Sequence, residues 1–103
     1  MPFKLIIKAE AYEDIAEAFE YYEIQSAGLG DRFWKELKLY FSKIENHPTH
    51  YGFSDEVPGM IFRDVLMDSF PYRIYYEIAG KEVIVFAIIH GQRNPDFIRK
   101  RLI

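Results

Sequence analysis

Three arginines and one histidine are the residues of this chain that could do chemistry together. Arg63, Arg73, His90 and Arg93 lie on, or just past the ends of, the strands predicted in residues 60–103. Metal-free cleavage of RNA needs a base for the 2′-hydroxyl, cations for the scissile phosphate and an acid for the leaving oxygen. His90 could be the acid or the base because its charge changes near neutral pH, and Arg73 and Arg93 could hold phosphate through paired hydrogen bonds. A nuclease reading would therefore make Arg73, His90 and Arg93 catalytic.

The same residues also allow a purely structural role. Arg73 could pair with Glu77 or another carboxylate, and His90 could cap the end of its strand through a backbone hydrogen bond. We favour this structural interpretation, so no residue is assigned as catalytic.

The sequence does not support other kinds of active site. The chain has no cysteine, which excludes disulfides, thiolate catalysis and Cys-based zinc sites. His47 and His50 are three residues apart, but they fall in a predicted loop without a third histidine, so we expect an exposed pair and no metal. No serine lies in a nucleophile elbow, and no phosphate loop or dinucleotide fingerprint is present. The sequence therefore predicts neither a metal nor a cofactor.

The charge of the chain is unevenly distributed. The net charge is −3, but residues 1–59 carry −5 and residues 60–103 carry +2. The basic excess is concentrated near the C-terminus, in Arg93, Arg99, Lys100 and Arg101, with only Asp96 opposing it. Because proteins that act directly on nucleic acid are usually basic, we expect no direct nucleic-acid binding without a partner protein.

The hydrophobic pattern predicts an α+β fold with the order β-α-α-β-β-β. Alternation in residues 3–8 indicates a first strand, and helical spacing indicates an amphipathic helix from Glu10 to about Ser26 with Gly28 as its C-cap. A second helix is predicted from Asp31, a good N-cap, to Asn46, followed by a loop over 47–59. The remaining elements are an edge strand over 60–67, two strands over 72–78 and 83–89 joined by a turn at 79–81, and a short helix or extended tail over 95–102.

This pattern places a helical hairpin on one face of a mainly antiparallel four-stranded sheet, within one domain over residues 1–103. The strand over 83–89 has no polar residue, so both of its faces must be covered. Strict alternation would put Val83, Val85, Ala87 and Ile89 on one face and Ile84, Phe86 and Ile88 on the other. Because the hairpin can cover only one set, we expect an apolar patch on the other that attracts a partner.

Two features of the helices could be read as docking sites or as ordinary structure. The first helix carries six acids and no base, which we interpret as a solvated face, although Tyr21 and Ile24 project among those acids. Trp34 lies at the margin of the second helix's apolar stripe, and we expect it to pack against a neighbouring element.

The order of several short motifs resembles the RelE/ParE superfamily of type II toxins. Residues 69–95 run from Phe70-Pro71-Tyr72-Arg73 through an apolar strand into His90-Gly91-x-Arg93-x-Pro95. The patterns Ala11-x-x-Asp14-Ile15-x-x-Ala18-x-x-Tyr21-Tyr22 and Arg32-Phe33-x-x-x-Leu37 match the helical half of the family. The resemblance implies the same fold, with the first strand pairing with the last.

Within the superfamily the chain is more similar to the ParE-like branch. The RelE-like ribosome-dependent nucleases carry lysines on the strand before the Tyr-Arg strand and often a tyrosine in the C-terminal element. This sequence has Asp64, Leu66 and Phe97 instead. The resemblance therefore implies a toxin that is neutralised by a cognate antitoxin and that inhibits DNA gyrase or a related topoisomerase when free. The alternatives are a RelE-like, metal-independent mRNA endonuclease acting on the ribosome and a non-toxic interaction protein on the same scaffold. The net charge of −3 is consistent with the second alternative.

We expect any target-binding surface to lie in the C-terminal half. It consists of Arg63, Arg73, His90, Arg93, Arg99, Lys100 and Arg101. We also expect a cytoplasmic protein without a membrane segment, because the apolar run Leu5-Ile6-Ile7 is far shorter than a signal sequence or the roughly 20 residues of a membrane span.

Overall fold

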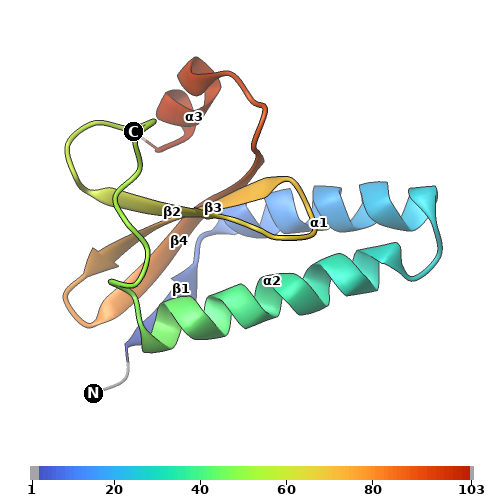
Figure 1. Ribbon diagram of the computed structural model, residues 1–103, viewed down its shortest axis with the longest axis horizontal. Coiled ribbons are helices and arrows are strands. Elements are labelled where there is room, and N and C mark those ends of the chain that lie inside the picture. The colour runs from blue at the N-terminus through green and yellow to red at the C-terminus, as the bar shows by residue number, and fades with distance from the viewer. Residues whose placement is uncertain (1–2, 103) are drawn as a thin grey trace.

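A four-stranded sheet lies between two long helices on one side and a short helix on the other (Figure 1). The computed structural model describes residues 3–102. The elements follow the order β1 (Lys4–Ile7), α1 (Ala9–Gln25), α2 (Leu29–Asn46), β2 (Phe62–Leu66), β3 (Tyr72–Ala79), β4 (Glu82–His90) and α3 (Pro95–Leu102). The strand order is β1-β4-β3-β2, with β4 parallel to β1 and antiparallel to β3. The predicted α+β fold, the pairing of the first strand with the last and the edge position of β2 are confirmed.

The turn between the two long helices differs from the predicted one. α1 ends at Gln25 and Ser26 is its C-cap, whereas Gly28 has a φ of +87° and is the residue that precedes α2. Asp31 lies inside the first turn of α2 and is not its N-cap. The side chain of Glu23 instead accepts a hydrogen bond of 2.9 Å from the backbone N–H of Gly30. A carboxylate from the preceding helix thus satisfies a free N–H of α2, which is the role that the sequence suggested for Asp31.

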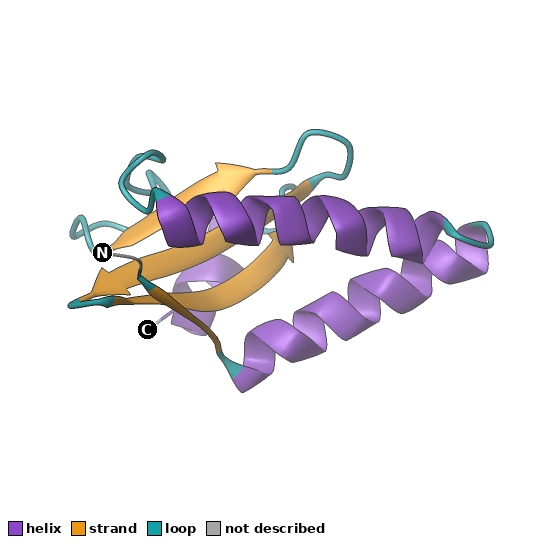
Figure 2. Ribbon diagram, turned by 90° about the horizontal axis from the view of Figure 1, so that it is seen from below, coloured by secondary structure: helices purple, strands orange, loops and turns teal. Residues whose placement is uncertain are grey.

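The hairpin of α1 and α2 packs against one face of the sheet, to which β3 contributes alternate residues. Ile74 and Tyr76 are buried there. Of the five residues predicted to form the apolar stripe of α2, four are also buried, namely Phe33, Leu37, Phe41 and Ile44, and the fifth, Tyr40, is partly buried against the same cluster. Trp34 is half-buried and packs against this core cluster, as expected, and its ring also lies edge-on to Phe41 of the same helix. Both long helices extend past the sheet (Figure 2).

Strict alternation along β4 was wrong because the strand contains a bulge. Tyr76 pairs with Val85 and Tyr75 pairs with Ala87, so Phe86 has no partner on β3. An extra residue in one strand reverses the side on which the following side chains lie. Ile88 therefore joins Val83 and Val85 beneath the hairpin, while Ala87 and Ile89 lie on the other face.

The chain covers that other face with its own residues. Ile98 and Leu102 of α3 and Val57 of the loop before β2 are buried against Tyr75, Ala87 and Ile89. The apolar patch that we expected β4 to leave for a partner is therefore closed by α3 and this loop. Among the described helices, none combines the length and the apolar character that crossing a membrane requires.

Candidate functional site

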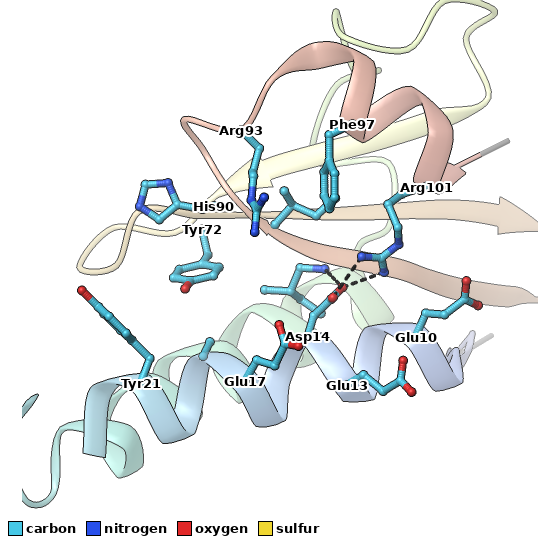
Figure 3. A pocket seen from close by; sticks show the side chains of 13 residues that line it. Glu10, Glu13, Asp14, Glu17, Tyr21, Tyr72, His90, Arg93, Phe97 and Arg101 are labelled. Atoms are coloured by element: carbon cyan, nitrogen blue, oxygen red, sulfur yellow. Dashed lines mark hydrogen bonds and ion pairs between the residues drawn. The ribbon is translucent and has the colours of Figure 1, made fainter. Parts of the chain in front are cut away.

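An open pocket of about 650 Å³ lies where α1, the end of β4 and α3 meet (Figure 3). It brings together His90, Arg93 and Arg101 of the expected target-binding surface. Four acids of α1 form the opposite wall, and the aromatic side chains at the pocket come from three segments; these residues are Glu10, Glu13, Asp14, Glu17, Tyr21, Tyr72 and Phe97.

Asp14 is the structural centre of this pocket. Its two carboxylate oxygens accept hydrogen bonds of 3.0 and 2.8 Å from the guanidinium of Arg101, drawn as dashed lines in Figure 3. One of the same oxygens accepts the backbone N–H of Ile88 at 3.0 Å, two residues beyond the bulge in β4. The hydrogen bonds to Asp14 are the main cause that raises the pKa of Arg101. Asp14 thus links α1, β4 and α3, and Arg101 is engaged inside the protein.

His90 is held at the end of β4. Its Nδ1 accepts a hydrogen bond of 3.2 Å from the backbone N–H of Gln92, and its ring lies edge-on to Tyr72 with centroids 5.4 Å apart. The hydrogen bond is the strand-end cap that the structural interpretation predicted. Burial, followed by the nearby Tyr21, raises the pKa of the Tyr72 phenol, so this group keeps its proton at neutral pH.

Arg73 and Arg63 do not line the pocket. The Nη1 atom of Arg73 donates a hydrogen bond of 3.1 Å to Asp64, and its Nε atom lies 3.7 Å from Glu56. Arg73 therefore pairs with a carboxylate, as the structural interpretation expected, although the partners are Asp64 and Glu56 and not Glu77. Arg63 donates a hydrogen bond of 2.6 Å to the carbonyl of Tyr51 and stacks on a phenylalanine ring. The three residues of the nuclease reading are consequently not gathered in one site.

The basic residues of the C-terminal segment differ in how firmly they are held. Arg99 pairs with Asp96 at 2.7 Å on the surface, and Lys100 is exposed. Arg93 is exposed and its guanidinium lies 4.6 Å from the ring centre of Phe97. Because α3 also buries Ile98 and Leu102, the segment is a packed helix, which is the first of the two alternatives predicted for residues 95–102, and not an extended tail.

Sequence reasoning missed the role of Asp14. We grouped it with the solvated acids of α1, yet it lies three residues after Ala11 and four before Ala18, both of which are buried. This spacing puts a carboxylate at the margin of the apolar stripe, where it needs a cationic partner. Nothing in the local sequence identifies Arg101, 87 positions away, as that partner.

Residues that could hold a metal are not clustered in the described part of the chain. No group of three or more His, Cys, Asp or Glu side chains with suitable geometry occurs among residues 3–102. His47 and His50 are both exposed.

Two of three comparisons relate this chain to known proteins. A search of curated proteins finds no match. A solved structure described as the chromosomal ParDE TA system from P. aeruginosa superposes with a TM-score of 0.76 and 17% sequence identity, over 85% of this chain and 95% of that one. This likeness confirms the fold. The family model of the ParE toxin of the type II toxin-antitoxin system parDE matches residues 5–95. Since this match spans most of the sequence, the chain belongs to the ParE family of type II toxins.

Proposed function

We propose that this protein is neutralised by a cognate antitoxin and, when free, inhibits DNA gyrase or a related topoisomerase. The observation that carries the proposal is the family match over residues 5–95. A toxin of this kind acts by binding another protein, so it needs a surface and not a catalytic pocket.

The contacts of Arg73 do not fit the nuclease alternative. An arginine that holds a scissile phosphate must be free to bind an anion. Here the guanidinium of Arg73 already pairs with Asp64 at 3.1 Å and lies 3.7 Å from Glu56, and His90 uses Nδ1 to cap the strand end. Asp64 and Leu66 also replace the lysines of RelE-like nucleases.

Messenger RNA is expected to remain intact when the purified protein is added to programmed ribosomes. The reason is that Arg73 pairs with Asp64 and Glu56 and does not line the pocket that holds His90 and Arg93, so these three residues are not arranged to act together on one scissile phosphate. Primer extension across the ribosomal A site measures the result. Cleavage there that disappears in both Arg73→Ala and His90→Ala variants would establish the endonuclease instead.

DNA supercoiling by gyrase is expected to fall when the purified protein is added and to recover when the small protein encoded beside it is included. The two proteins should also co-purify. In cells, induced expression should trigger the DNA damage response before translation slows. Co-purification without any effect on growth would favour the non-toxic interaction protein, and translation arrest as the first event would argue against a topoisomerase target.

A further inference from the structure

The outer surface of the helical hairpin carries an apolar groove of about 510 Å³ between α1 and α2. Its lining residues are Tyr12, Ile15, Ala16, Phe19, Glu20 and Trp34. Ala16 is exposed and Tyr12 is 56% exposed, so the groove faces solvent. Apolar surface of this kind, bordered by charged residues, is typical of protein interfaces.

The two helices that border the groove carry opposite charges. α1 has six acidic residues and no basic one. α2 carries Arg32, Lys35, Lys38 and Lys43, all of them exposed. Of its three acids, Glu36 and Glu45 already accept backbone N–H groups of Ser69 and Leu5.

These charges do not neutralise one another within the chain. Among the described residues no ion pair joins α1 to α2, and the only acid of α1 in a salt bridge is Asp14, whose partner lies on α3. Glu20 lines the groove and Lys38 lies over the ring of Trp34, at 5.4 Å from its centre. The groove therefore has an acidic edge and a basic edge, both of which face a potential partner.

A second copy of this chain fits that arrangement. In a two-fold symmetric pair the same surface meets itself. When the symmetry axis runs parallel to the helices, α1 of one copy lies against α2 of the other, whereas an axis across the helices would bring the acidic α1 against another acidic α1. The acidic edge of each copy then meets the basic edge of its partner, twice per dimer. An amphipathic helix of another protein would need both charges in the matching order, whereas a second copy supplies them by symmetry.

The area of the hairpin face that a second copy could cover determines how stable the dimer should be. A helix of this length is about 25 Å long, and two neighbouring axes lie about 10 Å apart. A hairpin face would thus bury roughly 500 Å² per copy, at the lower limit for a specific interface. We propose that the protein forms a weak, reversible homodimer through this groove, with the four helices packed as a bundle. This inference does not depend on the proposed function.

A charge-exchange experiment tests the dimer directly. Glu20→Lys and Lys38→Glu each place like charges at both edges, so each variant alone should be monomeric in sedimentation equilibrium. Mixed together they should form a heterodimer at least about tenfold more stable than either homodimer, because both contacts become attractive again. A role within one chain cannot produce this recovery on mixing. Glu20→Lys also relieves repulsion with neighbouring acids of α1, so the helix itself should not be weakened.

A second pair of variants tests the apolar floor of the groove. Ala16→Arg should make the protein monomeric, whereas Gln25→Arg, the same charge change at another exposed position of α1, should leave the dimer unchanged. Raising the salt concentration should weaken the wild-type dimer. Circular dichroism confirms that each variant is folded. A wild-type protein that stays monomeric at high concentration, or a mixture that does not recover, would overturn the proposal, as would Ala16→Arg blocking only the antitoxin.

Discussion

Replacing Asp14 by alanine is expected to lower the free energy of unfolding by about 3 kcal/mol, because three hydrogen bonds lose their acceptor. The carboxylate accepts two bonds from Arg101 and one from the N–H of Ile88, and the side chains of Asp14 and Arg101 are only 14% and 22% exposed. The variant would leave a guanidinium and a backbone donor without partners in a mostly buried place. Urea denaturation measures the change, with an unchanged m-value showing that unfolding stays two-state.

Glu17→Ala is the matched control. Glu17 also lies on α1 and lines the same pocket, but it is exposed and has no salt bridge among the described residues. Its removal should change stability by less than about 0.5 kcal/mol. In a double-mutant cycle, Asp14→Ala and Arg101→Ala should couple by about 1–3 kcal/mol. Equal stabilities of Asp14→Ala and Glu17→Ala would show that the link between α1 and α3 contributes nothing.

The parts of the fold that could be predicted are those in which one face is polar and the other apolar. In β3, Arg73 and Glu77 alternate with Tyr72, Ile74 and Tyr76, so the pattern itself identifies the buried face. The helical stripe of α2 is read in the same way, because its apolar residues recur at helical spacing.

The bulge in β4 could not be predicted for the opposite reason. Every residue from Val83 to Ile89 is apolar, so no polar side chain marks the position where the faces exchange. The bulge also affects the candidate site, because the backbone N–H group that donates a hydrogen bond to Asp14 belongs to Ile88, just past the bulge.

The partners of the charged residues were predictable in kind but not in identity. That Arg73 pairs with a carboxylate follows from the cost of leaving a partly buried charge alone. Its actual partners, Asp64 and Glu56, come from the neighbouring strand and a loop, and only the tertiary structure brings them together. One feature of the sequence that we did not use predicts the burial of α3: Ile98 and Leu102 are four residues apart, so they lie on the same face of a helix.

Growth inhibition is expected to disappear when Arg99 and Lys100 are both replaced by alanine, with thermal stability almost unchanged. Arg101 belongs to the same expected surface but is left unchanged, because it binds Asp14 and its loss would destabilise the protein. Arg99 and Lys100 are exposed, and the Arg99–Asp96 pair lies on the surface, where such a bridge contributes little. Their removal should therefore cost less than about 0.5 kcal/mol.

The physical reason for the loss is that these two cations, with Arg93, form the exposed basic surface of α3 and the segment before it, in a chain whose first 59 residues carry −5. A polyanionic or acidic target would be attracted there and repelled by α1. Lys4→Ala with Lys81→Ala is the matched control, since it removes two exposed cations at the other end of β4 and should leave toxicity intact. The measurement is colony formation after induction, together with antitoxin co-purification and a melting curve for each variant. Full toxicity in the Arg99 and Lys100 variant would place the target-binding surface elsewhere. Tyr21 and Ile24 of α1 would then be the next candidates, because both are exposed and project among its acids.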